Sequence, residues 1–100
     1  MIKHIVMWRL KEEAEGATKA ENAQKMKEML EALKGMIPDI IQIEVGINFL
    51  DAPPAYDVAL YSEFANVAGL NAYQVHPEHE KCKAFIGKIV CDRAVVDYEI

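Results

Sequence analysis

The opening strand of this chain constrains its fold more than any other feature, because apolar side chains fall on both of its sides. Alternate residues of an extended strand point to opposite faces. His4, Val6 and Trp8 therefore share one face, while Ile5 and Met7 share the other. A strand that is apolar on both faces belongs in a protein interior, so we expect both of its sides to be covered.

A helix and two strands are predicted to follow. Thr18 is a typical N-cap residue, and apolar residues then recur at the three- and four-residue steps of an amphipathic helix. These residues are Ala23, Met26, Leu30, Leu33 and Ile37. Alternation across residues 41–49 and again across residues 56–64 predicts two strands joined by a proline-containing loop. The acidic residues 11–16 are predicted as a loop.

Two further helical pieces and a last strand complete the chain. Asn66 is predicted to cap a helix that reaches Gln74, and Pro77 to occupy the first turn of the next helix. The residue before a proline avoids the helical region, so His76 is expected to mark the break between them. Residues 94–100 alternate again and predict a closing strand.

The resulting order βαββαβ is that of the ferredoxin-like fold, an α+β fold in which a four-stranded antiparallel sheet carries its helices on one face. We expect residues 1–100 to form one such domain, because a chain of this length has room for a single core. Helices on one face leave the other face bare, although the opening strand is apolar there too. We therefore predict a homodimer in which the bare faces of two copies meet and form a shared α/β barrel.

Composition excludes several kinds of partner. Eleven basic and sixteen acidic side chains give a net charge of −5, so we expect neither nucleic-acid nor membrane binding. Lys3 and Arg9 interrupt the apolar start, which fits neither a signal peptide nor a membrane span, and a cytoplasmic location is expected. Cys82 and Cys91 are too few for a disulfide framework. The five glycines are dispersed and form no phosphate-binding loop, and we expect no cofactor.

The candidate site is the segment from Tyr73 to His79, where two imidazoles and a phenol surround a proline. A histidine can remove a proton from the carbon next to a carbonyl, while a tyrosine hydroxyl can hydrogen-bond to the enolate oxygen that forms. The N-terminus of a helix favours a neutral His79, whereas Glu78 and Glu80 favour a charged one. For His76, capping of the helix break is favoured over catalysis.

A metal site is an alternative interpretation of the same histidines. His76 and His79 are three residues apart, and His4 or Asp57 would supply a third ligand. However, the break at Pro77 removes the shared helical face that this spacing needs, and no second ligand motif is present. We therefore expect no metal site.

Three stretches of the sequence are similar to the stress-responsive α/β barrel family, also called the Dabb family. They are IKHIVMWRLK at the start, YQVHPEHEKC in the centre and RAVVDYE at the end, so the resemblance covers essentially the whole chain. It implies a dimeric α/β barrel. A plant cyclase of this family closes a polyketide ring by aldol condensation and uses a tyrosine and a histidine as its acid–base pair.

Carried over to this chain, the resemblance implies that Tyr73 and His79 form that pair and that His4 lies in the same pocket. Two positions differ from the plant cyclase. Asp57 stands in place of a pocket histidine, and Leu30 stands in place of a tyrosine that lines the substrate tunnel.

These observations lead to two hypotheses. The first is a homodimer whose pocket, formed by His4, Tyr73 and His79, binds a small hydrophobic carbonyl compound, with cofactor-independent cyclase-, isomerase-, lyase- or monooxygenase-like chemistry. The second is a non-catalytic stress protein whose barrel is a scaffold for assembly. A cavity beside His4 and His79 favours the first hypothesis, and a solidly packed core favours the second.

Overall fold

One antiparallel sheet of four strands organises the computed structural model, which describes residues 1–100. The strands β1 (Ile2–Leu10) and β5 (Val58–Phe64) lie in the centre, and β4 (Ile40–Ile47) and β6 (Val90–Glu99) form the edges. Because β1 pairs with β6 on one side and with β5 on the other, the first and last strands of the chain are neighbours. The predicted ferredoxin-like fold is confirmed.

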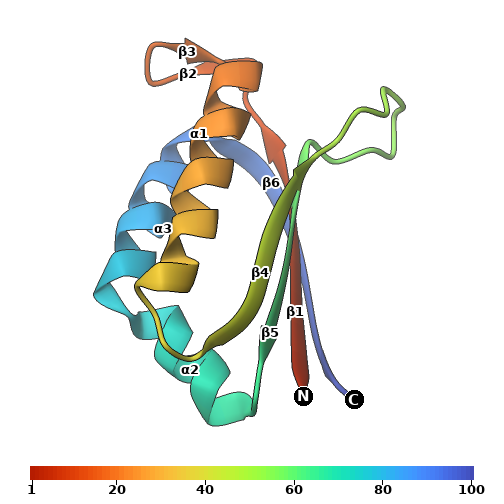
Figure 1. Ribbon diagram of the computed structural model, residues 1–100. Coiled ribbons are helices and arrows are strands. Elements are labelled where there is room, and N and C mark those ends of the chain that lie inside the picture. Colours follow the sequence, from red (N-terminus) through yellow and green to blue (C-terminus); the bar gives the residue numbers. More distant parts are fainter.

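All helices cover the same face of this sheet (Figure 1). The helix α1 (Lys19–Ala32) continues into a short 3₁₀ turn, η1 (Leu33–Gly35), and lies beside α3 (Pro77–Ile89). The shorter helix α2 (Val67–Val75) lies at one end of the layer. Every helix is too short or too polar to cross a lipid bilayer.

Local capping explains where the helices begin. The Thr18 hydroxyl accepts from the Glu21 amide while the Glu21 carboxylate accepts from the Thr18 amide, which is a complete capping box. The Asn66 side chain accepts from the Gly69 amide at the start of α2. His76 ends α2 and begins α3, and its Nδ1 accepts from the Glu78 amide at 3.1 Å. The predicted capping role of His76 is confirmed.

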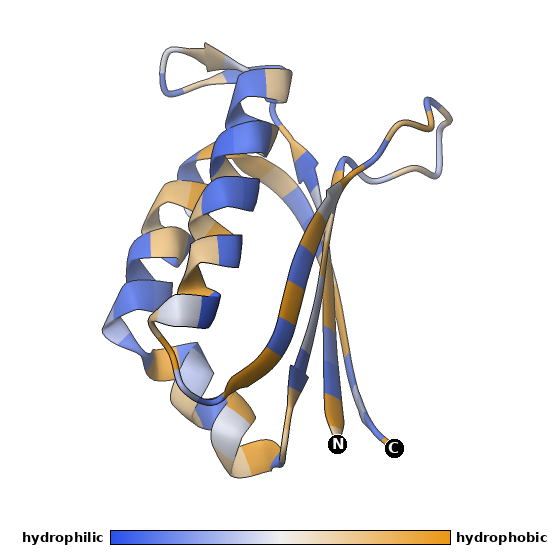
Figure 2. Cartoon of the chain, viewed as in Figure 1, coloured by the Kyte–Doolittle hydropathy of each residue, from blue (hydrophilic) through white to orange (hydrophobic).

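The core lies between the helices and the sheet. Val6 of β1 is opposite Leu60 of β5 and Val95 of β6, and the same register carries His4 and Trp8 to the helix side. On the helix side, Met26 and Leu30 of α1 and Ile86 of α3 belong to the same buried cluster as Val6, Trp8 and Leu60. Figure 2 shows the corresponding pattern, with hydrophobic and hydrophilic residues alternating along β4.

The opposite face of the sheet has no cover within the chain. Ile5 is opposite Val96, Met7 is opposite Ala94, and Tyr98 follows on the same side. Met7, Val96 and Tyr98 are all exposed large apolar residues. The loop of residues 48–57 projects from the sheet on this side, away from the helices (Figure 1), and its Phe49 is 99% exposed.

The structure differs from the sequence-based prediction in three places. Residues 11–16 are not only a loop, because β2 (Glu13–Ala14) and β3 (Ala17–Thr18) form a small hairpin. Its two turn residues have positive φ, 52° for Glu15 and 73° for Gly16, as a two-residue hairpin turn requires. The last strand begins at residue 90 and not at 94. The alternation of β4 is interrupted by a register shift at residues 40–42 and ends at residue 47.

The capping box gives a first prediction. Thr18→Ala removes the oxygen that satisfies the Glu21 amide, and should lower the free energy of unfolding by about 1 kcal/mol. Urea unfolding at a fixed protein concentration measures this change. Glu28→Ala, an exposed substitution in the middle of the same helix, is the control and should change stability by less than about 0.5 kcal/mol. Equal effects of the two substitutions would contradict the capping role.

Candidate functional site

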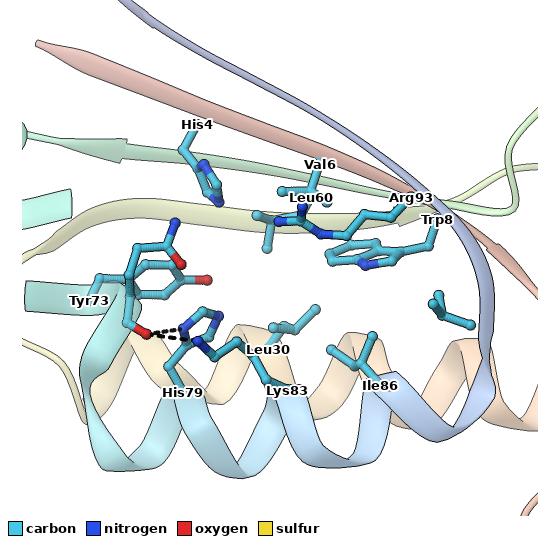
Figure 3. Close-up of a pocket in the computed structure, with 13 residues that line it drawn as sticks. His4, Val6, Trp8, Leu30, Leu60, Tyr73, His79, Lys83, Ile86 and Arg93 are labelled. Atoms are coloured by element: carbon cyan, nitrogen blue, oxygen red, sulfur yellow. Dashed lines mark hydrogen bonds between the residues drawn. The ribbon is translucent and has the colours of Figure 1, made fainter. Parts of the chain in front are cut away.

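A cavity of about 220 Å³ lies between the sheet and α3. Its wall contains His4, Tyr73 and His79, the three residues that the sequence singled out. Figure 3 shows them at one end of the cavity, with His4 directed from β1 toward the two helix residues. Most of the remaining wall is apolar and includes Trp8, Leu30, Leu60, Ile86 and Val90. The structure thus brings the three candidate residues to one hollow space.

His4 is held by a residue that the sequence analysis missed. The imidazole is only 2% exposed, and its Nδ1 is hydrogen-bonded to the carboxylate of Asp97. The two residues are opposite each other in the β1–β6 register, so their side chains point to the same face. With Nδ1 engaged, Nε2 is the ring nitrogen left for the cavity. The parity of the last strand, which puts Asp97 on the charged face, was the available clue.

Tyr73 and His79 come from the two sides of the break at His76. Tyr73 lies in α2 and His79 in the first turn of α3, and their rings stack with centroids 4.1 Å apart. The centroid of the His4 ring is 6.0 Å from that of Tyr73. Burial raises the pKa of the Tyr73 hydroxyl, so this group is a neutral hydrogen-bond donor across the physiological range.

His79 is neutral for a different reason from the one the sequence suggests. Burial lowers its pKa to about 4, and the nearby Lys83 ammonium acts in the same direction. The Gln74 carbonyl and the Glu80 carboxylate oppose this shift without reversing it. Nδ1 lies 3.4 Å from the Gln74 carbonyl oxygen and donates to it, which leaves Nε2 unprotonated. Loss of water around the ring therefore decides its charge.

Two other residues considered for the site lie elsewhere. The ring of His76 caps α3, and the carboxylate of Asp57 accepts from the Leu10 amide at 2.8 Å and pairs with Lys19. Neither residue lines the cavity. No group of three histidine, cysteine, aspartate or glutamate side chains is placed to hold a metal ion. The geometry thus gives no support to a site built from His76, His79 and Asp57.

The arrangement has the components of acid–base chemistry on a carbonyl compound. Tyr73 supplies a neutral hydroxyl that can donate to a carbonyl oxygen. His4 supplies a ring nitrogen that can accept a proton, and the Asp97 carboxylate would stabilise the imidazolium that results. The side chains of Tyr73 and His4 are almost fully buried, and the low polarity around them strengthens both interactions.

Proteins with closely similar folds include two crystal structures of unknown function. A dimeric ferredoxin-like protein from Bacteroides fragilis is 35% identical, with a TM-score of 0.83 over 99% of this chain and 95% of that chain. A dimeric ferredoxin-like protein from Thermobifida fusca is 26% identical, with a TM-score of 0.83 over 99% and 90% of the two chains.

The sequence relationships agree with the structural ones. An uncharacterized protein of Streptomyces coelicolor is 31% identical over an alignment of 100 positions, which covers 99% of this chain and 99% of that chain. The family model described as the stress responsive A/B barrel domain, Dabb, matches residues 2–100. The match covers all three of the stretches from which the resemblance was inferred, and the chain belongs to the Dabb family.

Proposed function

We propose that this protein is a homodimeric, cofactor-independent enzyme that removes a proton from the carbon next to a carbonyl group of a small hydrophobic substrate. The observation that carries this proposal is the buried pair of Asp97 and His4 at the end of a cavity that also contains Tyr73 and His79. The cavity beside these residues supports the proposal of a binding pocket. No observation favours the alternative of a scaffold with a solidly packed core.

His4 is assigned as the base. A base works best when the pKa of its conjugate acid lies near the working pH, and the pKa of about 4 makes His79 a weak acceptor. His4 has a carboxylate partner that fixes its tautomer and stabilises the charged ring. In this scheme His4 Nε2 takes the proton from carbon, and the electrons of the C–H bond move into the enolate.

Tyr73 and His79 act on the oxygen side of the substrate. The Tyr73 hydroxyl donates to the carbonyl oxygen and stabilises the negative charge that develops there. His79 stacks on Tyr73 and keeps that ring in place, and its pKa of about 4 makes it too weak a base to take the tyrosine proton. Return of the proton from His4 to a different carbon of the enolate completes an isomerisation. In a cyclisation, the enolate carbon attacks a second carbonyl of the same molecule, and the alkoxide that forms takes the proton from His4, which restores the neutral base.

The homodimer is proposed through the uncovered face of the sheet. Ile5, Met7, Val96 and Tyr98 form an apolar strip on that face. Two solved relatives that are 35% and 26% identical to this chain are dimeric. A second copy placed on this strip removes the apolar residues from water while leaving the cavity on the helix side.

Deuterium exchange tests the proposed chemistry. Benzylacetone, a small ketone with an apolar ring, should exchange the protons next to its carbonyl in D₂O faster with the protein than without it, as followed by NMR. Asp97→Asn should slow this exchange by about 100-fold or more, because the amide favours the wrong tautomer of His4. Tyr73→Phe should slow it through loss of the donor to the oxygen.

Glu99→Gln is the matched control for Asp97→Asn. Glu99 lies two residues further along β6 on the same face of the sheet, but its side chain has no imidazole partner. This variant should retain the rate of the unmodified protein. If Asp97→Asn and Glu99→Gln exchange equally fast, the assignment of His4 as base is wrong.

The charge of His79 gives a pH-dependent prediction. NMR titration of its ring protons should report a pKa near 4. Because the unfolded imidazole takes up its proton near pH 6.5, the free energy of unfolding should fall as the pH drops from about 6.5 toward 4. His79→Leu should flatten this part of the stability curve. A ring that is charged well above neutral pH would rule out the neutral role given to His79.

Two adjacent valines test the dimer. Val96 lies on the uncovered face and is 52% exposed, while Val95 lies on the helix side and is 49% exposed. Val96→Glu should place a carboxylate in the apolar interface and yield a monomer at micromolar concentration in sedimentation experiments. Val95→Glu should remain a dimer. A dimer that survives Val96→Glu, or a monomeric unmodified protein, contradicts the proposed interface.

A further inference from the structure

The charge of the cavity wall is opposite to the charge of the whole chain. The protein has sixteen acidic and eleven basic side chains and a net charge of −5. Nevertheless, the only charged residues that line the cavity are Lys83 and Arg93, and no acidic residue does. A concave site with one sign of charge attracts ligands of the other sign, and an apolar wall strengthens this effect. The cavity is therefore electrostatically suited to an anion.

Arg93 is the stronger of the two candidate anion ligands. It lies on β6 opposite Trp8, and Figure 3 shows its side chain extending along the sheet side of the cavity. Its guanidinium takes part in none of the ion pairs of the structure, whereas Arg9 pairs with Asp92 at 3.7 Å. An unpaired guanidinium has a planar set of donors that matches a carboxylate.

Lys83 is already engaged within the protein. Its Nζ donates to the Gln74 carbonyl at 3.1 Å and pairs with the Glu80 carboxylate at 2.8 Å. These contacts use two of its three donors and neutralise its charge. Lys83 therefore adds little to the positive character of the cavity, and it has less capacity than Arg93 to bind a ligand directly.

We propose that the ligand of this cavity is a small carboxylate with an apolar body, and that Arg93 is the residue that selects it. This proposal rests on the proposed function, since the carbonyl of the same ligand would lie between His4 and Tyr73. The ligand's body would lie against the apolar wall formed by Trp8, Leu30 and Ile86. The volume of about 220 Å³ accommodates a ring with a short acid chain, since an apolar cavity of about 150 Å³ already binds benzene.

The single tryptophan of the chain provides a site-specific probe. Trp8 is in the cavity wall, so its fluorescence reports occupation of this cavity. Phenylbutyrate and phenylbutyramide have the same body and differ in charge. The unmodified protein should bind phenylbutyrate at least ten-fold more tightly than the amide, because charge-assisted hydrogen bonds to Arg93 are available only to the acid. Added salt should weaken the binding of phenylbutyrate but not that of phenylbutyramide.

Two variants distinguish the contribution of Arg93 to binding from that of Lys83. Arg93→Leu should lower the affinity for phenylbutyrate by about 10- to 100-fold and leave the affinity for the amide unchanged. Lys83→Met should lower the affinity for the acid by less than about three-fold, because its charge is already paired. Circular dichroism checks that both variants are folded. Equal affinities for acid and amide, or a preference that survives Arg93→Leu, overturn the proposal.

The result is independent of the exchange experiment, because neither probe carries a ketone. If neither compound binds while benzylacetone still exchanges its protons, the anion proposal fails and the proposed function stands. If the acid binds through Arg93 and no exchange occurs, the cavity is a carboxylate-binding site and the proposed chemistry fails. Absence of both binding and exchange removes both proposals.

Discussion

The pairing of the first strand with the last determines most of what this fold can do. β1 lies in the middle of the sheet and forms hydrogen bonds to β6 along almost its whole length. This register places Asp97 opposite His4 and Arg93 opposite Trp8, although these residues are some ninety positions apart in the chain. A shift by one residue would turn both side chains to the other face of the sheet. The site therefore depends on the sheet register as much as on the identity of its residues.

The break between α2 and α3 supplies the second half of the site. A continuous helix from Val67 to Ile89 would be straight, and would fix Tyr73 and His79 at the angle that a six-residue spacing imposes. Pro77 prevents this continuation, and the extended backbone of His76 sets a new direction for α3. The two rings then stack across the break. His76 itself serves as the cap that stabilises this geometry, which explains a histidine outside the cavity.

Local patterns predicted the parts of the structure that local forces determine. The N-caps at Thr18 and Asn66, the break at His76 and the two-sided character of β1 all follow from residues within one or two turns. The hairpin at residues 13–18 was missed because Glu15 is not a typical residue for positive φ, and the position is held by contacts such as that between the Asn22 side chain and the Ala14 carbonyl. The bulge in β4 has no comparable sequence marker.

The candidate site was predicted in part for the same reason. His4, Tyr73 and His79 stand out by type and by family resemblance, and they line one cavity. Asp97 and Arg93 were not selected, because their importance arises only when β6 pairs with β1 over a long sequence separation. The position of Asp57 outside the cavity also depends on a contact between residues far apart in the sequence. Its carboxylate is used by the Leu10 amide at the end of β1, a contact that no local pattern indicates.

The spacing of charged residues on β6 also limits the shape of a ligand. Arg93 and Asp97 are four residues apart on one face, and a strand advances by about 3.3 Å per residue, so their backbones are separated by about 13 Å. The Arg93 side chain extends from one end of this distance, and the imidazole of His4 lies at the other end, next to Asp97. The remaining distance fits a molecule whose acid group and reactive carbonyl are separated by a few carbon atoms. Under both proposals, one strand provides the residue that orients the base, Asp97, and the residue that binds the acid group, Arg93, and its register fixes the distance between them.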